Sequence, residues 1–169
     1  MERPKTGDYP AYYEKYLNLL PENNPIEAMR KNIFLMEDFV KKLPPEKESF
    51  KYAEDKWTVK EVIGHIIDTE RIMAYRVLRI ARNDKKNLEG FDQNEFIANA
   101  NFGTQKLKDL LEEYVLVKKS NIALFTTFNE EMLQRRGSAN GTEVTVLAMM
   151  YFIPAHDLHH LNILKERYL

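Results

Sequence analysis

Residues 57–70 have the sequence WTVKEVIGHIIDTE, which contains the start signal and the first turns of a long amphipathic helix. Thr58, followed three residues later by Glu61, is a capping-box pattern: each side chain bonds the backbone N–H of the other residue at a helix N-terminus. Apolar residues then recur every three or four positions, at Val62, Ile66, Met73, Val77 and Ile80. The pattern predicts a helix from Trp57–Thr58 to about residue 83.

Three further segments show the same helical periodicity. They cover residues 25–43, about 104–128 and about 142–167. Pro25 suits the first turn of a helix, Pro44 and Pro45 end the first of these segments, and the turn pair Asn140–Gly141 precedes the last. Four amphipathic segments of this length predict an all-α fold, a four-helix bundle.

The rest of the chain consists of an N-terminal stretch and one long connection. Residues 1–24 are rich in tyrosine and interrupted by prolines, which predicts an N-terminal arm, with at most one short helix, that packs on a bundle formed by residues 25–169. The connection from Asp84 to Gly103 is long for a helix bundle. Such connections are usually functional or contain a short helix of their own.

Composition excludes several classes of function. The chain of 169 residues has the length of one domain and a formal net charge of −1, so it lacks the surplus of basic residues that nucleic-acid binding requires. It contains no cysteine, which rules out disulfides, thiolate metal ligands and a cysteine nucleophile. No apolar run is long enough to span a membrane. These features favour a cytoplasmic protein with a small-molecule substrate, and neither a nucleic acid nor a membrane as partner.

Three of the four histidines lie within residues 155–160, AHDLHH. In the predicted last helix, His156 and His160 are four residues apart and project from one face. That face also carries Val146, Met149, Ile153, Ile163 and Arg167, and it is expected to point into the bundle. His65 lies at the edge of the apolar stripe of its own helix. Three nitrogen ligands from two helices would leave coordination positions open, which is typical of a catalytic metal site.

These histidines also have a simpler interpretation, as hydrogen-bonded core residues. Two adjacent buried imidazoles are harder to explain in this way, because each needs a polar partner. Spacing alone leaves both interpretations open. His159 lies nearer the flank of the helix and is expected to face solvent or to support a ligand. The chain contains neither the His-Glu-x-x-His motif of zinc proteases nor the paired Glu-x-x-His motif of di-iron bundles.

The helical segments resemble those of the DinB-like superfamily. Residues 57–70 are similar to its Trp-Ser/Thr…His-x-x-Asp-x-Glu signature, and residues 144–146 with 156–161 are similar to its last helix, which carries His-x-x-x-His. Residues 90–102 resemble the intervening loop of one bacterial branch, and the similarity extends over residues 25–169. The resemblance implies an up-down-down-up bundle, often dimeric, that holds one divalent ion such as zinc or nickel. The ligands would be His65, His156 and His160.

The same resemblance implies a small set of activities. Members of the superfamily include bacillithiol- and mycothiol-dependent transferases and isomerases, in which the metal is thought to lower the pKa of a thiol cofactor. Three roles therefore stay open for this chain. It could transfer an external low-molecular-weight thiol of the bacillithiol type to an electrophilic substrate, hydrolyse a substrate with a metal-activated water, or be a non-catalytic bundle that the metal stabilises.

The sequence does not assign a catalytic residue beyond the metal ligands. Glu61 is better explained as the capping-box glutamate than as a partner of His65. Arg76 follows His65 by three helical turns and would hold an acidic substrate group only in an elongated pocket. Asp92, in the long connection, could close over the site.

Three charged residues are expected to matter for structure. Asp68 and Glu70 match the signature and are favoured as bracing residues of the bundle. Lys118 stands where the branch is expected to have arginine, which leaves its family role open.

Overall fold

The computed structural model describes residues 2–169, and four long helices form its core. These helices are α2 (Pro25–Lys42), α3 (Val59–Ala81), α5 (Leu107–Phe125) and α7 (Val146–Arg167). The N-terminus of α3 has the predicted capping box, in which Thr58 accepts from the backbone of Glu61 and Glu61 accepts from the backbone of Thr58. Asn24 caps α2 in a similar way by accepting from the N–H groups of Ile26 and Glu27. Thr145 caps α7 in the same way. Three of the four long helices therefore begin directly after a residue whose side chain caps the helix.

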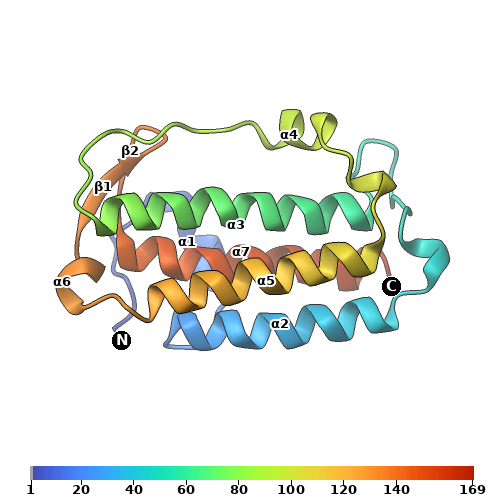
Figure 1. Cartoon of the computed structure of the whole chain (residues 1–169), viewed down its shortest axis with the longest axis horizontal. Helices are drawn as coiled ribbons and strands as arrows, with labels where there is room; N and C mark the ends of the chain where they lie inside the picture. Colours follow the sequence, from blue (N-terminus) through green and yellow to red (C-terminus); the bar gives the residue numbers. More distant parts are fainter. Residues whose placement is uncertain (1) are drawn as a thin grey trace.

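The helices run in an up-down-down-up order. Figure 1 shows α2 and α7 running in one direction and α3 and α5 in the other. The helix α3 packs against α5 and α7, and α2 packs against the same two helices. The four-helix bundle inferred from periodicity is therefore present, with the helix order that the resemblance implied. No helix within residues 2–169 is both long enough and apolar enough to cross a membrane.

The N-terminal segment lies along α7. It contains a 3₁₀ helix at Ala11–Tyr13 and the short helix α1 (Glu14–Leu17), which contacts α7. The side chains of Tyr13, Leu17 and Leu20 are buried. The guanidinium of Arg3 donates to the carbonyls of Leu17 and Leu20, at 2.7 and 2.9 Å, and holds the segment in place.

A β-hairpin that the periodicity did not predict precedes α7. Its strands are β1 (Arg136–Ala139) and β2 (Thr142–Thr145), preceded by the short helix α6 (Glu130–Leu133). Ala139 pairs with Thr142, so the turn is the two-residue pair Asn140–Gly141, with φ values of 51° and 71°. Positive φ at both positions defines the turn that suits a tight hairpin. The expectation that the last helix begins at about residue 142 is therefore wrong, since those residues form β2.

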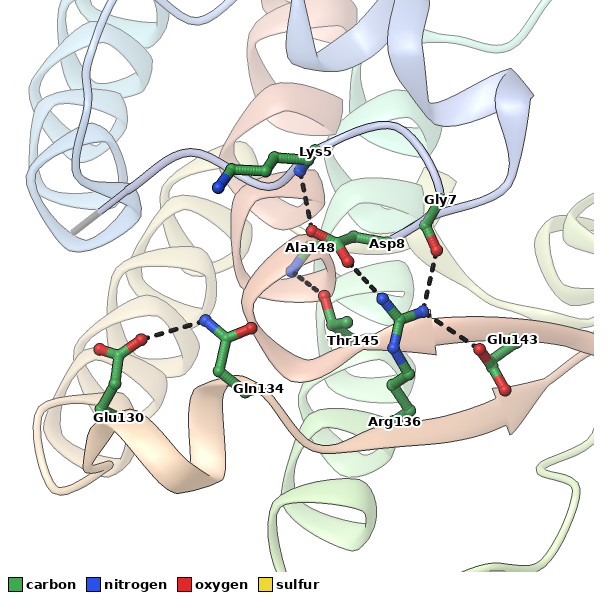
Figure 2. A network of polar contacts seen from close by, with 9 residues as sticks. All are labelled: Lys5, Gly7, Asp8, Glu130, Gln134, Arg136, Glu143, Thr145 and Ala148. Atoms are coloured by element: carbon green, nitrogen blue, oxygen red, sulfur yellow. Dashed lines mark hydrogen bonds and ion pairs between the residues drawn. The ribbon is translucent and has the colours of Figure 1, made fainter.

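The hairpin fixes the N-terminal segment to the start of α7 (Figure 2). Arg136 on β1 donates to the carbonyl of Gly7 at 2.8 Å, to the carboxylate of Asp8 at 2.5 Å and to Glu143 on β2 at 3.1 Å. At the end of β2, the Thr145 hydroxyl accepts from Ala148 N–H and caps α7. One arginine therefore joins three segments at the end of the bundle where α7 begins.

The long connection between α3 and α5 contains a short helix, one of the two alternatives expected for it. This helix, α4 (Gln93–Asn99), is followed by a 3₁₀ helix at Phe102–Thr104. Asp92 is exposed and caps α4 by accepting from Asn94 N–H and Glu95 N–H. Its carboxylate therefore accepts hydrogen bonds from the first turn of α4.

Gly64, the residue before His65, leaves room for the ring of Phe102. A Cβ at this position would lie 2.5 Å from ring atoms of Phe102, whereas a Cβ at Gly103 would meet nothing within 4 Å. We expect Gly64→Ala to lower the free energy of unfolding by about 1–3 kcal/mol, because the buried ring must move. Gly103→Ala is the control and should change it by less than about 0.5 kcal/mol. Urea denaturation of both variants measures the difference, and equal stabilities would show that this contact is not tight.

Candidate metal centre

The bundle brings three of the four histidines together. His65 comes from α3, and His156 and His160 come from α7, which packs against α3 in the opposite direction (Figure 1). The Nε2 atom of His156 lies 3.2 Å from Nε2 of His65 and 3.1 Å from Nε2 of His160. One ring nitrogen from each residue falls within 4.8 Å of the other two. The three imidazoles form a compact cluster because His156 and His160 are four residues apart on α7 and His65 lies next to them on α3.

The three imidazoles are neutral at physiological pH. Burial lowers the pKa of His65 to about 4. Burial, followed by the neighbouring imidazoles, holds the pKa of His156 well below its usual range, and the same causes lower that of His160. A neutral imidazole has a lone pair on one ring nitrogen, which is the form that binds metal ions.

Hydrogen bonding between the rings does not satisfy all three nitrogens. Each ring nitrogen offers either one N–H or one lone pair, so Nε2 of His156 can serve only one of its two neighbours. A cation placed among the lone pairs would serve all three. Nitrogens about 2.05 Å from a zinc ion would be about 2.9 Å apart at a right angle and about 3.3 Å apart at the tetrahedral angle. The separations of 3.1 and 3.2 Å on either side of His156 lie between these values, and all three nitrogens fall within 4.8 Å of one another, so the cluster could hold a divalent transition metal.

Aromatic and hydroxyl groups surround the cluster. Thr69 Oγ1 lies 3.4 Å from Nδ1 of His65, on the side of the ring away from the other histidines. A proton on that Nδ1 would face the hydroxyl and leave Nε2 free as a ligand. The ring of Trp57 lies 4.8 Å from that of His65, and the ring of Tyr16 lies 6.1 Å from that of His156. These rings place apolar surface next to the histidines.

Two cavities reach the cluster. One, of about 210 Å³, is lined by His65 and His156 and extends to Arg76 and to Tyr12 and Tyr13 of the N-terminal segment. The other, of about 240 Å³, is lined by His160, and Trp57 forms part of its wall. The histidine cluster is therefore accessible to small molecules and is not a closed structural site.

Comparison with known families and structures agrees with this geometry. The family model of the DinB superfamily matches residues 28–164. The chain belongs to the DinB superfamily. The match includes all three clustered histidines, and it leaves outside the N-terminal segment that lines the first cavity. No curated protein sequence matches the chain significantly.

Two solved structures share the fold. One is YfiT from Bacillus subtilis, described as a probable metal-dependent hydrolase with an unusual four-helix bundle topology. It superposes with a TM-score of 0.78 at 14% identity, over 98% of this chain and 91% of YfiT. The other is the DinB-like protein YjoA from Bacillus subtilis, with a TM-score of 0.59 at 19% identity, over 84% of this chain and 87% of YjoA. At these identities the likeness shows the fold alone.

The structure also places the other residues that the sequence singled out. His159 lies outside the cluster, half-buried, with its ring 5.0 Å from that of Tyr16. Glu61 belongs to the capping box, as favoured, because its carboxylate accepts from Thr58 N–H at 2.7 Å. Asp92 caps α4 and is not among the residues that line either cavity. Asp68 lies at the edge of the bundle, 3.9 Å from Arg71.

A buried ionic cluster next to the histidines was not predicted as a unit. Lys118 on α5 forms ion pairs with Glu70 on α3 and with Asp157 on α7, and all three side chains are almost fully buried. Asn32 on α2 donates to the carbonyl of Pro154 at 2.9 Å and lies 3.5 Å from the Asp157 carboxylate. Tyr114 also donates to Asp157, at 3.0 Å. Polar side chains from all four long helices therefore form one buried cluster around Lys118 and Asp157, the residue after His156.

Proposed function

We propose that this DinB-superfamily chain is an enzyme that binds one zinc or nickel ion through His65, His156 and His160. In our proposal it transfers an external low-molecular-weight thiol to an electrophilic substrate. The observation that carries the proposal is the set of three neutral, converging imidazoles beside two cavities. A divalent ion held there would act as a Lewis acid and lower the pKa of a thiol that occupies an open coordination position. The chain has no cysteine, so the thiol must come from outside.

The proposed reaction forms one bond and breaks one. The sulfur of the thiol attacks an electrophilic carbon, the new S–C bond forms, and the leaving group departs with the electron pair of the broken bond. The thiol proton passes to solvent. In this scheme the cavity walls hold the two reactants close together and keep bulk water from the electrophile.

The composition of the cavity walls favours thiol transfer over hydrolysis. Besides the metal-bound water, a hydrolase usually has a general acid or base that takes up the water proton or protonates the leaving group, most often a histidine or a carboxylate. Among the described residues, no aspartate or glutamate lines the cavity shared by His65 and His156. The cavity at His160 has Asp55, which is exposed and bonded to Lys56. A thiol with a lowered pKa is already a nucleophile and needs no such base.

Hydrolysis is the second candidate, because YfiT, which shares the fold, is described as a probable metal-dependent hydrolase. Both reactions would use the same three histidines. A non-catalytic role, in which the metal only stabilises the bundle, is the third. The presence of two cavities at the cluster argues against that role.

A thiol-binding experiment separates the three functions. We expect bacillithiol or glutathione to produce a thiolate-to-metal charge-transfer band when added to protein loaded with one equivalent of Co²⁺ or Ni²⁺. We also expect conjugation to 1-chloro-2,4-dinitrobenzene at least about 10-fold faster than without protein. Both signals should vanish in His160→Ala. Hydrolysis of p-nitrophenyl acetate without a thiol band would favour the hydrolase, and the absence of band, conjugation and hydrolysis would leave a non-catalytic bundle.

A further inference from the structure

Arg76 on α3 is a buried cation without a carboxylate partner. The residue is 7% exposed, and no aspartate or glutamate of residues 2–169 lies within ion-pair distance of it. The guanidinium donates to the carbonyl of Glu89 at 2.5 Å and lies 3.5 Å from the sulfur of Met73. These contacts involve two of its five N–H donors and supply no negative charge.

The other cation that is deeply buried among residues 2–169 is neutralised. Lys118 is fully buried and forms ion pairs with both Glu70 and Asp157. Burial of an unpaired charge is unfavourable, and burial accordingly lowers the pKa of Arg76. An arginine nevertheless keeps its proton at neutral pH. The positive charge of Arg76 therefore faces a site where a ligand could supply the missing anion.

Arg76 lines two cavities, and one of them also reaches His65 and His156. The wall of that cavity also includes Tyr12, Tyr13 and Asn140, and no carboxylate from the described residues. Burial raises the pKa values of Tyr12 and Tyr13, so both phenols keep their protons and can act as donors. A surface made of a guanidinium and neutral hydroxyl and amide groups complements an oxyanion.

The distance between the two ends of the cavity follows from helix geometry. Arg76 follows His65 by eleven positions on α3, which corresponds to roughly 16 Å along the helix axis. Side chains on a helix lean toward its N-terminus, and the contact with Met73 shows that Arg76 does so by about one turn. The guanidinium therefore lies roughly 11 Å along the helix axis from the Cα atom of His65. A small extended molecule can reach both.

We propose that Arg76 binds an oxyanion group, a carboxylate or a phosphate, of the small molecule whose reacting group lies at His65 and His156. The placement of the molecule's reacting group at the two histidines rests on the proposed function. The anion site rests on Arg76 alone. The expected ligand is a small molecule whose reactive atom and anionic group are separated by about six to eight bonds.

The anion site can be tested on the protein as purified. Inorganic phosphate and succinate, in separate calorimetric titrations, should each bind wild type, and the tighter of the two identifies the preferred oxyanion. Arg76→Met should weaken the preferred anion at least about 10-fold, because a neutral side chain of similar length replaces the charge. Arg76→Lys should retain part of the binding and covers the case in which Arg76→Met does not fold. Arg82→Met is the matched control, because it removes an exposed arginine at the C-cap of the same helix that lines neither cavity of Arg76. Equal binding by wild type and Arg76→Met, or no binding by either anion, would overturn the proposal.

A pair of thiols of one length tests both ends of the cavity. On protein loaded with Co²⁺, 6-mercaptohexanoate should bind at least about 10-fold more tightly than the uncharged 6-mercapto-1-hexanol, as followed by the charge-transfer band. Arg76→Met should abolish this preference while it still binds the alcohol. If neither thiol gives a band but phosphate or succinate still depends on Arg76, the proposed thiol transfer fails and the anion site stands. If both thiols bind equally in wild type, the anion site fails and thiol binding stands.

Discussion

His160→Ala is expected to remove the metal from the purified protein. Wild type should contain about one zinc or nickel ion per chain, and the variant almost none, because a three-ligand site that loses a ligand retains only two nitrogens. Loss of a residue that merely supports a ligand lowers metal affinity about 10- to 100-fold, and loss of a ligand itself should exceed this range. Elemental analysis after dialysis measures the content, and a competition titration with a chelator measures the affinity. His65→Ala and His156→Ala should behave in the same way.

His159→Ala is the matched control for this experiment. His159 is next to His160 in the chain, but its ring faces Tyr16 and lies outside the cluster. Its removal should leave the metal content near one ion per chain. Equal loss of metal in His159→Ala and His160→Ala would show that the ligand set is wrong. No metal in wild type, even after reconstitution, would leave the three imidazoles as core residues and would remove the basis of the proposed function.

The sequence predicted the helices because periodicity and caps are local signals. The capping box of Thr58 and Glu61 and the apolar stripe of α3 are encoded within a few turns, and the structure has both. The hairpin before α7 was missed because each strand has only four residues, too few for an alternating pattern to stand out. The pair Asn140–Gly141 is the one local signal of the hairpin, because it favours a two-residue turn.

The helical stripe of α7 was only partly predictable. Every residue from Val146 to Asp157 is buried, because the N-terminal segment and the hairpin cover the side of α7 that a simple bundle would leave exposed. Beyond His160 the buried residues are Leu161, Leu164 and Tyr168, whereas Arg167, which was expected to point inward, is exposed. Contacts between segments far apart in the chain determine both features, and periodicity does not report them.

The candidate site was also predictable only where its residues are close together in the sequence. Spacing on one helix was sufficient to group His156 with His160. The cavity that joins His65 to Arg76 was not predictable, because Tyr12 and Tyr13 of the N-terminal segment form part of its wall. Metal identity, thiol transfer and a homodimer stay predictions, and the first two are tested by the experiments above.

The buried cluster around Lys118 provides the largest expected effect on stability. Burial by itself would lower the pKa of Lys118, but the carboxylates of Asp157 and Glu70 outweigh it and raise that pKa, so the amine is charged. Lys118→Met keeps most of the volume but leaves two carboxylates buried without a cation. We expect the free energy of unfolding to fall by about 3–5 kcal/mol, the usual result when one partner of a buried pair is removed. Such a loss is a large part of the roughly 5–15 kcal/mol that stabilises a typical domain.

Three further variants show that charge is the cause of this loss. Lys119→Met, at the exposed neighbouring position, should change stability by less than about 0.5 kcal/mol. Adding Glu70→Gln and Asp157→Asn to Lys118→Met should restore part of the stability, because neutral amides replace the unpaired carboxylates. Lys118→Arg should lose less than Lys118→Met, since it keeps the charge despite its larger volume. Urea denaturation measures all four free energies. If Lys118→Met stayed within about 1 kcal/mol of wild type, the ion pairs would not hold α3, α5 and α7 together beside His156.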